Sequence, residues 1–149
     1  MTCRINRSHL LLSALLCLAT SGCGGGGEPT VSARGKVTDA GRPLLVKDRD
    51  LGLGTVMVQF YRIADNPKGA RRQSTDPEEA EVDADGNFKV PGRSGDGIPP
   101  GRYRIAVRQW DPYPQVDRLK GRFDEKNSPI IREITGEEDI VIDVSKPEG

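Results

Sequence analysis

The strictest constraint on the fold is the alternation of side chains along residues 102–109, RYRIAVRQ. Tyr103, Ile105 and Val107 occupy every second position, and arginines stand at three of the positions between and beside them. A period of two is typical of a half-buried β-strand, because successive side chains of a strand point to opposite faces. Trp110 continues on the arginine side, so its ring is expected outside the core or at its rim.

Shorter segments along the chain have the same character. Strands are predicted over residues 31–38, 55–61, 129–135 and 140–144, and a hairpin is predicted from residues 80–82 and 87–90 around the turn DADG. The chain contains 18 Gly and 11 Pro, turn residues recur about every ten positions, and no segment has a helical period. These features predict an all-β fold, an antiparallel Greek-key β-sandwich of seven or so strands that occupies residues 31–145 as one domain. Residues 44–53 are expected to form a loop or edge segment, and residues 64–79 and 111–127 to form long loops.

The N-terminus has the form of a secretory signal. Arg4 and Arg7 precede the apolar run Leu10 to Ala19, which is too short to span a bilayer. The small residues before Cys23 resemble the lipobox of bacterial lipoproteins, with Thr20 in the place of the usual leucine. This resemblance implies a signal peptide at residues 1–22, lipidation of Cys23, and a glycine-rich tether at residues 23–30. The alternative is an ordinary secretory signal with a bystander cysteine; residues 146–149 are expected to be a tail.

Removal of residues 1–22 also removes side chains that could act in catalysis or bind a metal. The only histidine, His9, lies there together with Cys3 and Cys17. The mature chain would therefore have no catalytic triad, no Cys–His pair, no histidine- or cysteine-based zinc site and no internal disulfide. Loss of two arginines leaves 20 basic and 22 acidic residues, because 22 − 2 = 20. This balance argues against nucleic acid as a partner.

Three motifs occur in a fixed order: GKVTDAGRPL at residues 35–44, DADGNFKV at residues 83–90 and GIPPGRYRIAV at residues 97–107. Together they resemble the carboxypeptidase regulatory-like domain, a transthyretin-like β-sandwich. The resemblance implies folding support, adhesion or ligand display, and it does not imply catalysis. Gly86 is expected to supply a positive φ in its turn, and the Tyr103 hydroxyl is expected to bond to backbone.

Two aromatic residues are the candidates for a contact surface. In WDPYP, prolines flank Trp110 and Tyr113 at a strand end, where aromatic rings stack on sugars or hold a peptide. The alternative is that Trp110 caps the sandwich and Tyr113 anchors a loop. Arg108 belongs to a stripe that either binds an anionic polymer or lipid headgroups, or forms a solvated face paired with Glu133 or Asp143.

The acidic residues between positions 76 and 85 suggest either a calcium site or a solvated loop, and their spacing does not match an EF-hand. The sequence thus predicts no enzyme, no cofactor and no other metal site. It predicts a non-catalytic lipoprotein at the cell envelope, with its domain facing the periplasm or the exterior. Its role would be structural or in protein interaction, with a membrane partner through Cys23 and an envelope protein or glycan as a further partner. The alternative is a carbohydrate-binding accessory domain that uses Trp110 and Tyr113.

Overall fold

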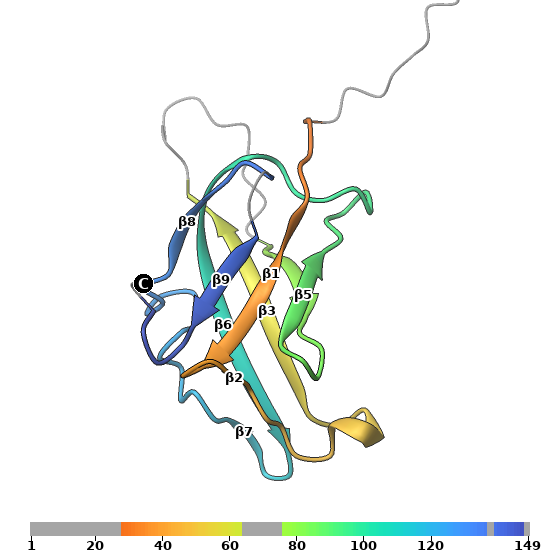
Figure 1. The fold of residues 1–149 in the computed structure, drawn as a ribbon, viewed down its shortest axis with the longest axis vertical. Coiled ribbons are helices and arrows are strands. Elements are labelled where there is room, and N and C mark those ends of the chain that lie inside the picture. Colours follow the sequence, from red (N-terminus) through yellow and green to blue (C-terminus); the bar gives the residue numbers. More distant parts are fainter. Residues whose placement is uncertain (1–27, 64–75, 137–138, 148–149) are drawn as a thin grey trace, which may run out of the picture.

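The structure of the chain is a computed structural model that describes residues 28–63, 76–136 and 139–147 (Figure 1). The expected signal peptide, Cys23 and the glycines of the expected tether lie outside these residues. So does most of the loop expected at residues 64–79.

Nine strands of the described residues form two sheets that pack face to face (Figure 1). The first sheet contains β1 (Ala33–Asp39), β2 (Arg42–Pro43), β5 (Asn87–Val90) and β9 (Ile140–Asp143). The second contains β3 (Thr55–Arg62), β4 (Glu78–Glu81), β6 (Gly101–Pro112), β7 (Gln115–Asp117) and β8 (Ile131–Ile134). A single 3₁₀ turn, η1 (Arg49–Leu51), precedes β3. The predicted all-β sandwich is confirmed.

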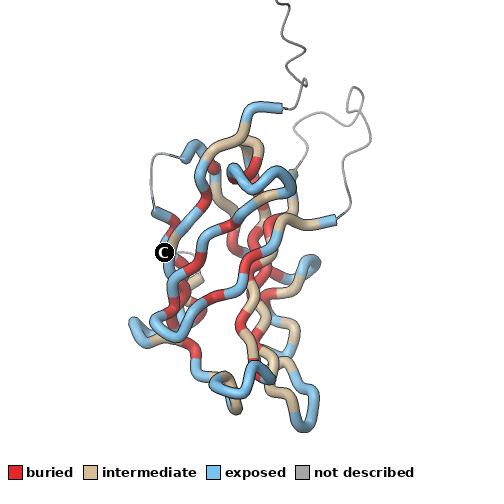
Figure 2. Tube along the Cα trace, turned by 90° about the vertical axis from the view of Figure 1, so that its right-hand side faces the viewer, coloured by how far each residue is buried: buried red, intermediate tan, exposed pale blue. Residues whose placement is uncertain are grey.

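The core lies between the two sheets and follows the alternation of the strands (Figure 2). On β6, the side chains of Tyr103, Ile105 and Val107 are at most 1% exposed. They meet the inward side chains of β3, among them Phe60, whose ring lies edge-on to that of Tyr103 with centroids 6.1 Å apart. The predicted inward faces of β3, β6 and β9 are confirmed, because each carries a buried residue at every second position.

One pairing departs from the expected antiparallel arrangement. β9 runs parallel to β1, with Gly35 opposite Ile140. A Cβ atom on Gly35 would stand 1.9 Å from the Ile140 carbonyl oxygen, so only glycine permits this approach. The chain arrives here from β8, in the other sheet, and crosses to the first sheet before it joins β1. Alternating patterns do not specify strand direction, which is why the sequence did not reveal this pairing.

The prediction that residues 80–82 and 87–90 pair with each other as a hairpin is wrong. The turn itself is tight, because the Asp83 amide donates to the Asn87 carbonyl at 2.8 Å, and Gly86 has the expected positive φ of 88°. However, β4 pairs with β3 in the second sheet, and β5 pairs with β1 in the first. The turn is therefore a corner that carries the chain from one sheet to the other.

The expected long loop at residues 111–127 is only partly a loop. β6 continues to Pro112 and forms a hairpin with β7. The following residues run along β6, where Val107 donates to the Phe123 carbonyl at 2.9 Å. Phe123 is 2% exposed and belongs to the core. The segment lacks a steady period because turns interrupt it, and so its single buried ring gave no signal.

Candidate functional site

A hollow of about 440 Å³ lies at the loop end of the sandwich, where β3 begins and the β6–β7 hairpin turns. Trp110 and Tyr113 both line it, so the structure brings together two of the residues singled out from the sequence. Leu53 and Thr55 form the side of the hollow next to β3, and Gln115 closes the side next to β7. The hollow thus presents two aromatic rings and an aliphatic side chain beside polar groups.

The direction of Trp110 follows from the register of β6. Trp110 lies opposite Thr55 of β3 and has the outward parity of the arginines, so its ring stands at the rim as expected. Tyr113 follows at the tip of the hairpin and is 71% exposed. The alternative in which Tyr113 anchors a loop is therefore wrong, because its ring is in solvent.

Arg108 contacts Trp110 but does not line the hollow. Its guanidinium carbon lies 6.0 Å from the centroid of the Trp110 ring, a cation–π geometry. Its Nε donates to Oε1 of Gln59 at 3.2 Å, and Gln59 in turn donates to Glu79 at 2.6 Å. Arg108 is thus held in a polar network on the outer face of β3, β4 and β6.

The arginine stripe was expected to pair with Glu133 or Asp143, but the structure shows only that one arginine lies opposite Glu133 on the neighbouring strand. Arg102 lies opposite Glu133 on β8. Arg104 instead donates to the backbone carbonyls of Glu125 and Lys126, and Asp143 accepts from the Ala40 amide and from Ser145. Arg104 and Arg108 are therefore engaged with the protein itself, Arg104 with backbone carbonyls and Arg108 with Gln59.

Residues 44–48, which we call the strap, cross this end of the molecule between β2 and η1. The buried amide of Gln109 donates to the Leu45 carbonyl at 2.6 Å. Asp111 accepts from the Lys47 amide at 3.2 Å and from Arg118 at 2.9 Å. The Arg118 guanidinium, with the Lys47 amide, lowers the pKa of Asp111 from its usual value. The strap is thus fixed against β6 through Gln109 and Asp111, and Asp111 also lines the hollow.

The same end of the sandwich carries an unusual amount of exposed apolar surface. Among the described residues, six large apolar side chains are exposed, and five of them belong to the strap, η1, the residue before Gly54, and the β6–β7 hairpin. These segments meet at the lower end of the molecule in Figure 1. We call this set the apolar end: Leu45 (81% exposed), Leu51 (71%), Leu53 (46%), Tyr113 (71%) and Val116 (45%).

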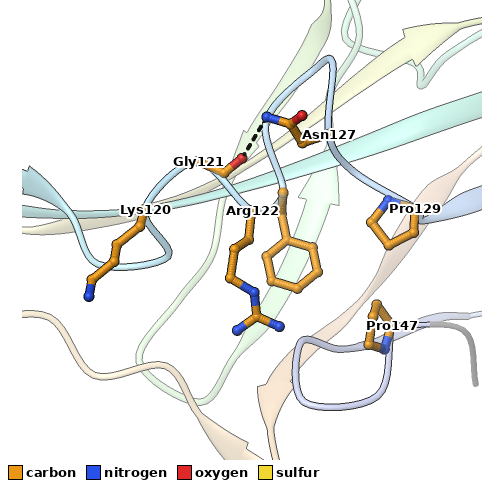
Figure 3. A pocket seen from close by; sticks show the side chains of 7 residues that line it. Lys120, Gly121, Arg122, Asn127, Pro129 and Pro147 are labelled. Atoms are coloured by element: carbon orange, nitrogen blue, oxygen red, sulfur yellow. Dashed lines mark hydrogen bonds between the residues drawn. The ribbon is translucent and has the colours of Figure 1, made fainter.

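A second hollow, of about 470 Å³, was not foreseen from the sequence (Figure 3). Lys120, Arg122, Pro129 and Pro147 line it around the buried ring of Phe123. The Arg122 guanidinium lies 5.2 Å from the centroid of that ring. In Figure 3, the Lys120 side chain points away from Arg122 and Pro147. The two cations thus do not converge on one position.

The acidic residues considered as a calcium site are dispersed. Asp83 accepts from the amides of Asp85 and Asn87 and from the Asn87 side chain, and the Asn87 amide chiefly lowers the pKa of Asp83. Glu79 and Glu81 bond to Gln59 and Thr55 on β3. Within residues 28–63, 76–136 and 139–147, no three His, Cys, Asp or Glu side chains come together as a metal site.

Tyr103 has a structural role. Its hydroxyl donates to the Pro99 carbonyl at 2.7 Å, as expected, and burial raises its pKa to about 12. The ring is 1% exposed, so this hydroxyl is a fixed hydrogen-bond donor that closes the loop before β6.

The fold and its loop end define a two-sheet β-sandwich that carries an aromatic-lined hollow within an exposed apolar surface. No family model, curated protein or solved structure matches the chain. No helix in the described part of the chain is long and apolar enough to cross a membrane.

Proposed function

We propose that the chain is a non-catalytic lipoprotein of the bacterial cell envelope, anchored through Cys23, whose sandwich acts as a structural or protein-interaction module. The anchor is supported by the signal-like sequence of residues 4–19 and by the small residues before Cys23. The module is supported by the resemblance of three motifs to the carboxypeptidase regulatory-like domain. The domain would face the periplasm or the exterior.

The observation that carries the proposal is the placement of the expected tether relative to the apolar end. Glu28, the first described residue, accepts two hydrogen bonds from Arg62, both at 2.7 Å, at the last position of β3. Val31 then forms a two-bond bridge with Ile98. The apolar end lies at the other end of β3, next to its first residue, Thr55. The seven residue steps from Thr55 to Arg62, at about 3.4 Å each, separate the two ends by roughly 24 Å. A domain held at one end would thus present its apolar loops at the other.

The motif residues that support the resemblance have structural roles. Gly35 permits the close approach of β9, Gly86 turns the corner between the sheets, and Tyr103 closes its loop on Pro99. None of these residues is placed to act on a substrate. A role in display or adhesion needs a stable scaffold that presents exposed loops, and the motif residues named above belong to the scaffold whereas the apolar end belongs to the loops.

The anchor is tested by mass spectrometry of the membrane fraction. The expected result is a mature N-terminal peptide that begins at Cys23 and carries a diacylglyceryl group. Cys23→Ser should abolish the modification and release the protein from the membrane. An unmodified protein that remains soluble, or a Cys23→Ser variant that is processed and partitions as before, would refute the anchor.

Carbohydrate binding is the second candidate, and the hollow is the observation that favours it. Trp110 and Tyr113 offer ring faces for a sugar, and Gln115 offers an amide beside them. A glycan titration followed by Trp110 fluorescence tests it, since Trp110 is the only tryptophan of the chain. A saturable shift of Trp110 emission would favour this candidate over protein interaction if Tyr113→Ala abolishes it. Substitutions far from Trp110 should leave the shift unchanged.

A further inference from the structure

We infer that residues 45–53 form a flap that opens and closes as one unit while both sheets stay folded. The flap is a gate for the hollow of about 440 Å³ at the loop end of the sandwich. None of its residues is buried, whereas Leu44 before it and Gly54 after it are. The inference goes beyond the proposed function and does not depend on the anchor at Cys23, because it concerns only how this segment is held.

The flap has little apolar contact with the rest of the protein. Val46 is the one side chain of the flap that packs against the core, and it is only partly buried. Leu45, Leu51 and Leu53 are exposed. The 3₁₀ turn η1 has no buried residue and stands outside both sheets at the lower end of Figure 1. Because apolar burial is the dominant favourable term in folding, a segment that lacks it depends on its hydrogen bonds.

Hydrogen bonds from side chains fasten the flap to the sandwich at two places, β6 and the corner after β4. They run from the Gln109 side chain to the Leu45 carbonyl (2.6 Å), from the Lys47 amide to Asp111 (3.2 Å), and from Arg49 to the Val82 carbonyl (2.6 Å). Each contributes modestly, because in the open flap the same groups bond to water. The bonds lie along one short segment, so the loss of one frees the chain beside the others, and we expect them to break together.

Two features of the closed flap favour its opening. Asp48 has a φ of 56°, in the left-handed region that costs a non-glycine residue free energy. Nη2 of Arg49 is buried and has no hydrogen-bond partner among the described residues. A buried donor without a partner is unfavourable, and water satisfies it once the flap opens. The closed flap is therefore held by few bonds against two local costs.

Two residues link the flap to the hollow. Leu53, the last residue of the flap, lines the hollow, and so does Asp111, which accepts from Lys47. Asp111 also accepts from Arg118 at 2.9 Å, so one carboxylate joins the flap to the chain after β7. Opening of the flap withdraws Leu53 and frees one oxygen of Asp111 beside Trp110. The hollow thus has its described shape only while the flap is closed.

Hydrogen exchange of the full chain in detergent micelles, followed by NMR, tests the flap. The reporters are two donors on different elements, the Lys47 backbone amide and the Gln109 side-chain amide. The reference amides are those of Val58 and Phe60, at the centre of β3 between β4 and β6. Protection compares each group with the same group in an unfolded chain. We expect equal protection at the two reporters, at least about tenfold below that of the reference amides.

Two variants loosen the flap from different contacts. Asp111→Ala removes the acceptor of Lys47 and should lower the protection of the Gln109 side chain by about fivefold, the equivalent of one hydrogen bond. Gln109→Met releases the Leu45 carbonyl and should lower the protection of the Lys47 amide to a similar extent. Gln109 does not line the hollow, so increased quenching of Trp110 emission by acrylamide in Gln109→Met reports the opening itself.

The matched control is Asp124→Ala. Asp124 likewise accepts from backbone amides, those of Lys126 and Asn127, in a turn outside the flap. Its hydrogen bonds are present whether the flap is open or closed. Asp124→Ala should therefore lower the protection of the reference amides, which exchange by global unfolding, and leave that of both reporters unchanged.

Four outcomes would overturn the inference. Equal protection at the reporters and the reference amides would mean that the flap opens only when the sandwich unfolds. Unequal protection at Lys47 and Gln109 would mean that the bonds break separately. Loss of reporter protection in Asp124→Ala would tie the flap to global unfolding. Unchanged quenching of Trp110 in Gln109→Met would refute the gate. None of these readings depends on whether Cys23 carries a lipid, so this inference and the proposed anchor fail separately.

Discussion

The Tyr103 hydroxyl donates a 2.7 Å hydrogen bond to the carbonyl oxygen of Pro99, four residues earlier in the chain. The bond closes the turn through which the chain enters β6, and the ring below it packs against Phe60 in the core. It thus joins a local turn to the core packing of the second sheet.

Tyr103→Phe should lower the free energy of unfolding by about 1–2 kcal/mol, because it leaves the Pro99 carbonyl without its partner. Denaturant unfolding measures this loss. Tyr113→Phe is the control, since its hydroxyl lies on an exposed ring, and it should have no effect. Equal stability of wild type and Tyr103→Phe would show that the bond contributes nothing net.

The same residue should make the protein sensitive to high pH. Burial raises the pKa of Tyr103 to about 12 in the folded chain, above the ordinary value of 10. Between these values the unfolded chain loses the proton and the folded chain retains it, so stability falls as pH rises through 10 toward 12. The fall attributable to Tyr103 is the difference between wild type and Tyr103→Phe across this window. A difference that stays constant from pH 8 to pH 11.5 would contradict the assignment.

Asp83 should contribute to stability in the opposite part of the pH range. The Asn87 amide and side chain hold its pKa below 3.8. A lowered folded pKa means a contribution that is present above the unfolded value and is lost as pH falls through the folded value. Asp83→Asn should therefore be less stable than wild type at pH 6 and equal to it near pH 2, by urea unfolding. Asp85→Asn, in the same turn, serves as the control, because the hydrogen bonds of this turn are accepted by the carboxylate of Asp83.

Gly35→Ala should disrupt the pairing of β1 with β9. The added Cβ would stand 1.9 Å from the Ile140 carbonyl oxygen, and neither strand can move without losing its core side chains. We expect a loss of more than about 3 kcal/mol, measured by thermal unfolding. Gly95→Ala has a positive φ of 87° but open space around it, so it should cost only about 1 kcal/mol. Similar losses in both variants would show that the close approach is not limiting.

Phe123→Ala should be as destabilising as a central core substitution, at about 3–5 kcal/mol, although Phe123 lies outside the named strands. Chemical denaturation measures the loss, and Arg122→Ala, which removes the cation beside the ring, is the control and should cost less than about 1 kcal/mol. A small effect of Phe123→Ala would mean that residues 118–128 are only loosely attached to β6.

The inward faces of the long strands could be predicted from the sequence because burial on one face imposes a period of two. Val56, Val58 and Phe60 on β3 follow this rule without exception. Strand partners could not be predicted in the same way. The turn before Asn87 has the same local bonds whether it joins a hairpin or a corner, and only the sheet that receives β5 decides between them.

The candidate site was predictable in part. Prolines around Trp110 and Tyr113 indicated exposed rings at a strand end, and the structure places both rings at one hollow. The contribution of Leu45, Leu51 and Leu53 was missed, because leucines in a segment with charged residues have no period that separates exposed from buried positions. Leu44, beside Leu45, is 6% exposed, so neighbouring leucines of the strap have opposite surroundings.

The parallel pairing of β1 with β9 has a mechanical consequence. β1 begins at the end of the sandwich where Glu28 bonds to Arg62 and runs toward the opposite end (Figure 1), with β5 and β9 bonded along its two sides. A pull between the two ends is therefore directed along these strands and across their hydrogen bonds. The bonds are loaded in shear and must yield together, so the domain resists stretching between its two ends better than it would if the strands could be peeled apart one bond at a time.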